Sequence, residues 1–578
     1  MPLRNYFPAL DWLRDYRREW LPGDLSAGLT VGVMLIPQGM AYAMLAGLPP
    51  IHGLYAATLP LILYAFLGTS RQLAVGPVAM DSLLTAVGVG AIATAGTEQF
   101  VALAAALAFL VGSIQLLGGV LRLGFLINLV SRPVISGFSS AAALIIAASQ
   151  LPHLLGTTPE HSGSFAGRLI ATLTTIPELH AYTLALGTGG ILLMVVLRRW
   201  NRKIPAPLIL VFLAVGVVYG WELAAHGVRI VGDIPAGLPA AGLALPGLDQ
   251  LAALLPTAAA IALVSLMESL GVGLAVERQR GERYIVPNQE LIAVGAANLG
   301  NALVGGFPGA GGFSRTAVND QAGAKTQLAA IISAAVVLLT LLFLTPLFYY
   351  LPTAVLASII MVAVLSLVDV ATARELWHRD RSDFWMLAVT FVATLVLGIQ
   401  WGIGVGVGLS LAVHVYRGMQ PHVAVLGRLP GTEDYRNVAR YPEAEQVAGT
   451  LVVRFDGRLY FANVTYFRQQ LAQRIAARDE LHTLVVNAEG IASLDSSAVA
   501  ELTDLIEEQN GWGRRIIFAG LIGPVRDIFR RNGLFALVGE QNFFLQVSEA
   551  MRAVSVKGGA ESDKDYALQT NFGQVGTA

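Results

Sequence analysis

A single carboxylate, Glu268, lies within the long apolar run ALVSLMESLGVGLAV (262–276). A charged side chain at membrane depth is costly, and an ionisable residue there is by default a functional candidate. Because burial disfavours the charged form, Glu268 can take up a proton near neutral pH. A proton on Glu268 would ease the entry of a divalent anion nearby, which is the basis of proton–anion symport. The alternative is a structural role as the partner of Arg315.

Two apolar segments are interrupted by glycine and proline, at RQLAVGPVAMDSLL (71–84) and GNALVGGFPGAGGFSRTAVND (300–320). A helix that starts inside the membrane leaves free N–H groups and the positive end of its dipole. Two such ends that face each other form an anion site without requiring a full charge. The two interruptions therefore predict a binding site for a small anion at the middle of the membrane.

In the first interrupted segment, Pro77 suits the first turn of a helix, because it lacks the N–H that would be left unpaired there. The amides that follow are then free to bind an anion, and they belong to Val78, Ala79 and Met80. The alternative interpretation of this segment is a simple proline kink.

In the second interrupted segment, Ser314 can donate its hydroxyl and its N–H to an oxyanion, and Phe313 can form a wall of the cavity. Alternatively, Ser314 only caps a helix. Arg315 can supply a fixed positive charge below the anion, or it belongs to an inner rim. The glycine-rich run before it lacks the Lys-Ser/Thr that a phosphate-binding P-loop requires.

Asp81 complicates the predicted site, because it lies one turn beyond the free amides, where a carboxylate should repel an anion. It can pair with Arg315 or another cation, or it can titrate. A cation site formed by Asp81 together with Glu268 is a further alternative.

Apart from anion binding and proton coupling, the residues indicate no catalytic chemistry. The nine histidines are scattered without metal-ligand spacing such as H-x-x-x-H, and no Ser-His-Asp arrangement emerges. The chain has no cysteine, which excludes disulfides, thiol catalysis and cysteine-ligated metals. We therefore expect neither an enzyme nor a resident metal or cofactor.

The composition places these residues in a membrane protein. The 578-residue chain is 55% hydrophobic and only 13% charged, with a mean hydropathy of +0.62. Soluble domains carry about 25% charged residues, so an ordinary soluble enzyme is excluded. The formal net charge of −1 gives no case for nucleic-acid binding.

Hydropathy predicts fourteen membrane spans, because a span needs about 20 apolar residues. Several are short or interrupted by glycine, notably those that start near residues 75 and 312. The predicted spans cover residues 24–45, 51–68, 75–92, 100–120, 125–148, 181–198, 205–222, 252–277, 288–304, 312–324, 327–345, 352–369, 383–399 and 402–417.

The charges of the loops support this number of spans. If residues 1–23 form a cytoplasmic segment, every second loop should carry Lys or Arg, and a missing span would invert the pattern after it. The predicted outer loops hold only Arg168 and Arg229. The inner loops and the span ends beside them hold Arg71, Arg122, Arg132, Arg198, Arg199, Arg202, Lys203, Arg278, Arg280, Arg283, Lys325, Arg374, Arg379, Arg381 and Arg417. Both ends of the chain are therefore expected in the cytoplasm.

The transmembrane region, residues 24–420, divides into two repeats of seven spans, at about 24–223 and 252–417. An odd number of spans in each half gives the two halves inverted topologies. Each half carries its interrupted segment at its third span, as in transporters that bind their substrate between inverted repeats.

A different kind of domain is predicted after the membrane region, at residues 435–556. Charges become frequent there, and strands alternate with helices, which is typical of an α/β sheet covered by helices. Residues 557–578 are Gly-rich and polar, and we expect a disordered tail. Strands are predicted at 451–455, 484–488 and 514–521, and helices at 464–478, 496–510 and 524–532.

Several runs resemble the SulP (sulfate permease) family of anion transporters. They are IPQGMAYAMLAGLPPIHGLYAA (36–57), AVGPVAM (74–80), SRPVISGF (131–138), PNQELIAVGAANLGNALVGGFPGAGGFSRTAVN (287–319) and, in the tail, SLDSSAV (493–499). The resemblance covers residues 20–555, and it implies a 7+7 inverted-repeat fold shared with nucleobase transporters. It further implies a cytoplasmic STAS domain, a core domain of spans 1–4 and 8–11, a gate domain of spans 5–7 and 12–14, and a homodimer.

The resemblance also implies roles for individual residues. Gln38 and Tyr42 lie four apart on one helix face and resemble the family's first-span contacts to the anion; alternatively, they are packing residues. In STAS domains a serine at the start of the 496–510 helix can be phosphorylated, although Asp495 or Ser496 is here expected to be a plain cap. Asp81 departs from the family, which often has a small or apolar residue at that position.

The leading hypothesis is a secondary active transporter in the plasma (inner) membrane that takes up sulfate together with protons. The substrate would sit near Val78 and Ser314, and an elevator-type motion of the core against the gate would carry it across. Sodium-coupled bicarbonate symport and dicarboxylate or chloride transport are alternatives within the same fold. A membrane-anchored signalling protein with the STAS domain as its output is the alternative from another class, and it needs no polar groups at membrane depth.

Overall fold

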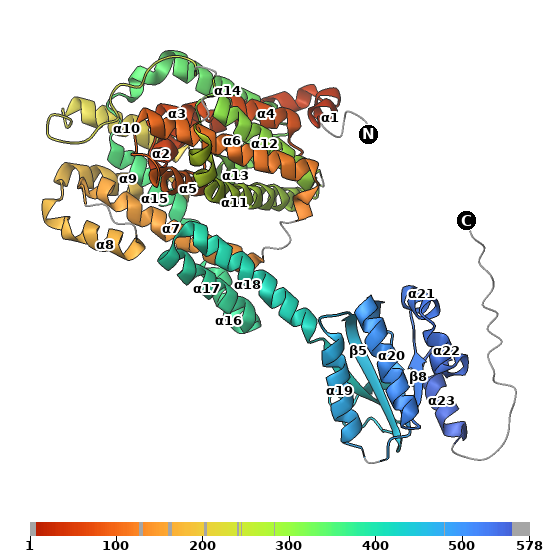
Figure 1. The fold of residues 1–578 in the computed structure, drawn as a ribbon. Coiled ribbons are helices and arrows are strands. Elements are labelled where there is room, and N and C mark those ends of the chain that lie inside the picture. Colours follow the sequence, from red (N-terminus) through yellow and green to blue (C-terminus); the bar gives the residue numbers. More distant parts are fainter. Residues whose placement is uncertain are drawn as a thin grey trace. The chain divides into compact units, whose positions relative to one another are not determined.

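The chain divides into two compact units, residues 1–411 and 412–578. The first unit is a bundle of helices, and the second is a β-sheet covered by helices (Figure 1). The computed structural model describes residues 7–125, 131–159, 164–200, 205–239, 242–243, 246–282, 284–478 and 480–557. The predicted loop cations Arg202, Lys203 and Arg283, residues 1–6 of the predicted N-terminal segment, and residues 558–578 of the predicted disordered tail lie outside this set.

Each of the fourteen predicted spans contains a helix in the structure. Seven of the described helices are long and apolar enough to cross a membrane by length and composition. The spans correspond to α2 (Leu21–Leu45), α3 (Ile51–Tyr55) with α4 (Leu59–Leu67), α5 (Ala79–Gly90), α6 (Glu98–Val120), α7 (Arg132–Leu155), α9 (Ala181–Trp200), α10 (Ala206–Gly220), α11 (Leu248–Arg280), α12 (Pro287–Leu303), α13 (Phe313–Gln321), α14 (Leu328–Leu339), α15 (Thr353–Leu365), α17 (Arg381–Leu397) and α18 (Ile399–Met419).

Some helices differ from the prediction. The fifth predicted span starts at residue 125, whereas α7 begins at Arg132 and carries Pro133 in its first turn, where proline favours a helix start. Two short amphipathic helices, α8 (Phe165–Thr174) and α16 (Val370–Arg379), lie in predicted loops, because neither has the continuous apolar run that hydropathy detects. The structure also adds α1 (Ala9–Arg14) before the first span, and it extends α14 by a π-helical turn (Thr340–Leu344) and a 3-10 turn (Thr345–Phe348).

The helices of the first unit pack in two groups. The first group joins α2–α6 with α11–α14, and the second joins α7, α9 and α10 with α15 and α17. The first group corresponds to the predicted core domain, and the second corresponds to the predicted gate domain without its last span, α18. Small residues bring helices together within the core: a Cβ added at Gly112 of α6 would lie 2.7 Å from the carbonyl oxygen of Gly295 on α12. Helix α2 contacts α10 and α15 of the other group.

The second unit contains a seven-stranded sheet in the order β4–β3–β5–β6–β8–β9, with β7 beside β5. Strands β5, β6, β8 and β9 run parallel, and β3 runs antiparallel to β4 and β5. Strand β3 precedes the predicted start of this domain at residue 435. The strands are β3 (His422–Arg428), β4 (Tyr435–Asn437), β5 (Thr450–Leu459), β6 (Thr483–Asn487), β7 (Ile491–Leu494), β8 (Arg515–Ala519) and β9 (Phe543–Phe544).

Helices cover both faces of this sheet, and its central strands are therefore buried on both sides. Val453, Val486 and Phe518 share one core with α19 (Val464–Ala476), α20 (Ser496–Gly511), α21 (Gly523–Arg531) and α22 (Leu534–Val538). The alternate residues Val452, Val485 and Ile517 share the other core with α23 (Val547–Lys557). The predicted α/β architecture of this part of the chain is confirmed.

Candidate functional site

The two interrupted segments meet in a short antiparallel ribbon. Strand β1 (Val75–Gly76) pairs with β2 (Ala310–Gly311), with Val75 opposite Gly311 and Gly76 opposite Ala310. The ribbon is extended by a hydrogen bond of 3.1 Å from the amide of Gly312 to the carbonyl oxygen of Ala74. Helices α5 and α13 begin shortly after the two strands, so the ribbon brings their N-terminal ends together.

Glycine is required at two points of this ribbon. Gly76 has a φ of +149°, in the region that L side chains rarely adopt. A Cβ at Gly309 would lie 2.7 Å from the carbonyl oxygen of Gly76. The glycine-rich sequence before α13 therefore serves the close approach of two backbones.

The first turns of both helices present amides that take no part in the hydrogen bonds of their own helix. The first intrahelical bond of α5 runs from the amide of Ser82 to the carbonyl oxygen of Val78, at 3.1 Å, and that of α13 runs from Thr316 to Gly312, at 2.9 Å. The amides before these bonds have no intrahelical partner. They include those of the predicted site residues Val78, Ala79 and Met80 on one side and Phe313, Ser314 and Arg315 on the other.

Arg315 is a buried cation at the ribbon. Its side chain is 2% exposed, and its Nη1 donates a hydrogen bond of 2.5 Å to the carbonyl oxygen of Pro77. Its Nε and Nη2 have no partner within the described part of the chain. The guanidinium therefore links the two interrupted segments and retains donors for a bound oxyanion.

Acidic and phenolic groups surround this cation. Glu268 of α11 interacts electrostatically with Arg315 and with Asp81, and Tyr42 of α2 interacts with Arg315 and Glu268. Neither a hydrogen bond nor an ion pair joins Asp81 to Arg315 among the described residues. Both oxygens of Asp81, Oε2 of Glu268 and both polar atoms of Gln38 also lack partners there.

The two ends of the predicted site differ in accessibility. Val78, Ala79 and Met80 are buried, whereas Phe313 is 52% exposed and Ser314 is exposed. The N-cap of α13 is Gly312, so Ser314 is not the helix cap that the alternative interpretation proposed.

Sequence reasoning missed side chains that hold or face this site. Arg198, predicted as a loop cation, lies on α9 and interacts electrostatically with Tyr42. Asn298 of α12 accepts a bond of 2.9 Å from the amide of Gly309 and donates one of 3.1 Å to the carbonyl oxygen of the same residue. Ser269 accepts a bond of 2.9 Å from the amide of Gly311. The polar character of Asn298 and Ser269 within apolar helices was the signal in the sequence.

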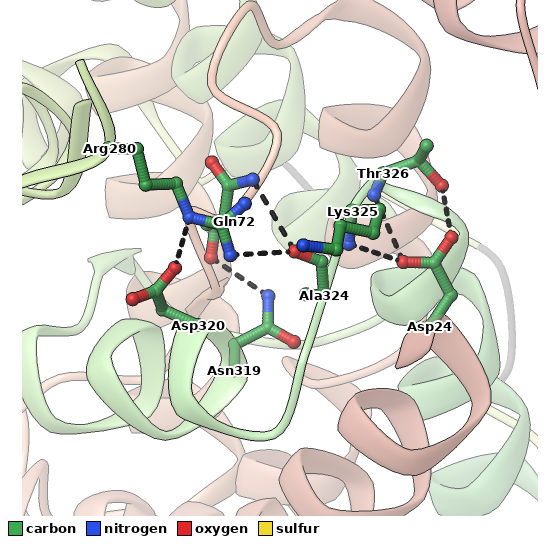
Figure 2. Close-up of polar contacts among 8 residues, drawn as sticks. All are labelled: Asp24, Gln72, Arg280, Asn319, Asp320, Ala324, Lys325 and Thr326. Atoms are coloured by element: carbon green, nitrogen blue, oxygen red, sulfur yellow. Dashed lines mark hydrogen bonds and ion pairs between the residues drawn. The ribbon is translucent and has the colours of Figure 1, made fainter. Parts of the chain in front are cut away.

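A second polar network fixes the other end of α13 (Figure 2). Arg280 of α11 forms an ion pair of 2.5 Å with Asp320 and donates a bond of 3.0 Å to the carbonyl oxygen of Ala324. Asp24 of α2 accepts hydrogen bonds from the amides of Lys325 and Thr326, at 2.7 and 3.0 Å, and from the Thr326 hydroxyl, at 2.7 Å. Helix α13 is thus tied to its neighbours at both ends.

In the second unit, Asp495 is the predicted plain cap. It is the N-cap of α20, and its carboxylate accepts a bond of 2.8 Å from the amide of Ala498. The same side chain accepts a bond of 2.9 Å from the amide of Phe461. Asp495 therefore holds the chain before α19 beside the start of α20.

Two interrupted helices that face each other inside a bundle of membrane helices, next to a buried cation, define an integral membrane protein of the transporter class. The chain belongs to the sulfate permease family: the model of that family matches residues 21–390. The model of the STAS domain matches residues 441–550.

Curated relatives match nearly the whole chain. Sulfate transporter 4.1, chloroplastic, of Arabidopsis thaliana is 38% identical over 571 residues, which cover 94% of this chain and 82% of that protein. A probable sulfate transporter of Mycobacterium tuberculosis is 36% identical over 555 residues, which cover 96% of this chain and 99% of that protein.

Solved structures share the fold. The murine solute carrier 26 family member A9 anion transporter, in the inward-facing state, matches with a TM-score of 0.90 at 26% identity, over 96% of this chain and 94% of that chain. The transmembrane domain of a cyanobacterium bicarbonate transporter, BicA, matches with a TM-score of 0.58 at 24% identity, over 68% of this chain and 98% of that chain.

Proposed function

We propose that the protein is a secondary active transporter that takes up sulfate together with protons. The observation that carries this proposal is the pair of helix ends, α5 and α13, together with two nitrogens of Arg315 that have no hydrogen-bond partner among the described residues. Such a site suits a small oxyanion, because amides and a guanidinium donate hydrogen bonds to several oxygens at once. Sulfate is the substrate named for the relatives from Arabidopsis and Mycobacterium.

Glu268 is proposed to bind the coupling proton. As a carboxylate it interacts with Arg315 and opposes the arrival of a divalent anion. As a neutral acid it leaves the guanidinium to the anion, so the proton and sulfate enter together and leave together. Gln38 and Tyr42 complete the proposed site from α2, Ser314 adds a hydroxyl donor, and Phe313 forms its wall.

An elevator-type motion is proposed to carry the site across the membrane. The helices that provide the site residues are α2, α5, α11 and α13, and all four belong to the core group. The substrate can therefore move with the core against the gate group without losing its ligands. We further propose a homodimer in the plasma (inner) membrane with both termini in the cytoplasm, in agreement with the loop charges.

The proposal is tested with purified protein in liposomes, by uptake of labelled sulfate under imposed H⁺ or Na⁺ gradients. We expect an inward proton gradient to accelerate sulfate uptake, and Glu268→Gln to abolish this acceleration because the variant cannot carry the proton. Glu98→Gln, which changes an exposed carboxylate at the start of α6, should behave like the parent protein.

Labelled bicarbonate, chloride and succinate distinguish the alternative substrates in the same liposomes. Bicarbonate uptake that depends on Na⁺ and not on pH would support sodium-coupled bicarbonate symport instead. Gradient-driven sulfate uptake that survives Glu268→Gln would contradict the role of Glu268. The absence of any solute flux, with a partner-dependent response that is lost on deletion of residues 435–578, would favour the signalling alternative.

A further inference from the structure

Asp81 is a buried carboxylate that the proposed function leaves without a role. It lies in the first turn of α5 and is 0% exposed. Neither of its carboxylate oxygens has a hydrogen-bond partner in the residues that the structure describes, and the same is true of Oε2 of Glu268. A buried carboxylate that accepts no hydrogen bond is unstable as an anion and is neutralised by a proton or a bound cation.

The charged groups around Asp81 reinforce this requirement. Helix α5 packs against α2, α6, α7 and α11. At membrane depth these helices carry Glu268 on α11, which interacts with Asp81, and Tyr42 on α2. The other ionisable residues of the four helices lie toward their ends: Asp24, Glu98, Arg132, His153, Asp249, Glu277, Arg278 and Arg280.

The charge balance of a loaded site decides between the states of the two acids. With both carboxylates ionised, they and a divalent sulfate would place four negative charges beside Arg315, the cation that interacts with Glu268, whereas Arg198 interacts with Tyr42. With both acids protonated, the sulfate carries the negative charge that faces Arg315, and each acid offers one O–H donor. Two protons and one sulfate also sum to zero net charge.

We propose that Asp81 is a second proton-binding site, so that the protein carries two protons with each sulfate. This inference rests on the proposed proton-coupled uptake of sulfate. Both acids take their protons from the side to which the site is open and release them on the other side, and the anion leaves as they ionise. Each complete cycle therefore moves no net charge.

The number of protons is measured in liposomes that contain the full chain, from the sulfate gradient that balances an imposed pH difference at zero membrane potential. Because each pH unit is a tenfold ratio of proton activity, two protons support a sulfate gradient of about 100-fold per pH unit and one proton about 10-fold. We expect about 100-fold for the parent protein and about 10-fold for Asp81→Asn. Asp81→Glu keeps a titratable acid and should retain the steeper dependence.

Membrane potential gives an independent readout. Parent uptake should not respond to an imposed potassium diffusion potential, whereas Asp81→Asn should be slowed by an inside-negative potential, because it carries one net negative charge inward.

A one-proton ratio in the parent protein, or an unchanged ratio in Asp81→Asn, would overturn the inference while leaving proton coupling intact. A Na⁺ requirement abolished by Asp81→Asn would overturn it in favour of a cation site. Sulfate uptake that ignores the proton gradient altogether would instead refute the proposed function.

Discussion

Arg315 is almost fully buried, yet only one of its three guanidinium nitrogens has a hydrogen-bond partner among the described residues. A planar guanidinium can bind Pro77 with one nitrogen and an oxyanion with the others. A lysine ammonium presents its donors from a single nitrogen and lacks this planar fork. Arg315 is therefore suited both to hold the ribbon together and to bind the substrate.

Arg315→Lys should weaken substrate binding more than it weakens the fold, because the positive charge stays while the fork of donors is lost. A hydrogen bond to a charged group is worth about 1.5–3 kcal/mol, so the KM for sulfate should rise by about 10- to 100-fold. Initial rates of labelled sulfate uptake in liposomes measure this change. Arg199→Lys, at an exposed position of α9, is the matched control, and an unchanged KM in Arg315→Lys would remove Arg315 from the binding site.

At the scale of elements, the ribbon between β1 and β2 brings two helix ends that are distant in the sequence together at the candidate site. Arg315 and Pro77 are 238 positions apart in the chain. The approach of the two strands depends on the absence of a side chain at Gly309, since a Cβ there would meet the carbonyl oxygen of Gly76. The ribbon is therefore sensitive to even one added methyl group at position 309.

Gly309→Ala should reduce sulfate uptake strongly, because one methyl group would force the strands apart and separate the ends of α5 and α13. Overpacking of this kind typically costs about 1–3 kcal/mol. The matched control is Gly271→Ala in α11, where an added Cβ has no neighbour within 4 Å in the described structure. Uptake and thermal stability are measured for both variants, and full activity in Gly309→Ala would show that the site tolerates separation of the strands.

The interruptions themselves could be predicted from the sequence, because glycine and proline break helices by local rules. The partners of the buried side chains could not. Asp24 accepts a hydrogen bond from the amide of Thr326, and Asn298 accepts one from the amide of Gly309. Such pairings depend on how distant helices pack. Arg198 ends the predicted span 181–198 and was counted with the loop cations, and its interaction with Tyr42 of α2 likewise depends on how distant helices pack.

At the scale of the whole molecule, each of the fourteen runs that hydropathy predicted contains a helix among the described residues, since a long apolar run is a local property of the sequence. It missed α8 and α16, whose apolar residues occupy only one face. It also missed β3, because this strand is recognised by its pairing with β5 rather than by its own sequence. An even number of spans predicts that both ends of the chain lie on the same side of the membrane. Only the charges of the loops support this prediction so far.

With fourteen spans, the loop between α5 and α6 and the STAS domain must lie on opposite sides of the membrane. The chain has no cysteine, so single cysteines at Ala95 in that loop and at Ser497 of α20, both exposed, can be labelled without a competing thiol. In intact cells, a membrane-impermeant maleimide should modify Ala95→Cys and not Ser497→Cys. Ser497→Cys should react only after permeabilisation or in inverted vesicles.

The cysteine-free parent chain controls for non-specific labelling, and denaturation before labelling confirms that both thiols are present. Equal labelling of Ser497→Cys in intact and permeabilised cells would place the STAS domain outside the cell. One predicted span would then have to lie on the membrane instead of crossing it. All loop charges after that span would change sides, and the two halves of the chain would no longer be related as inverted repeats.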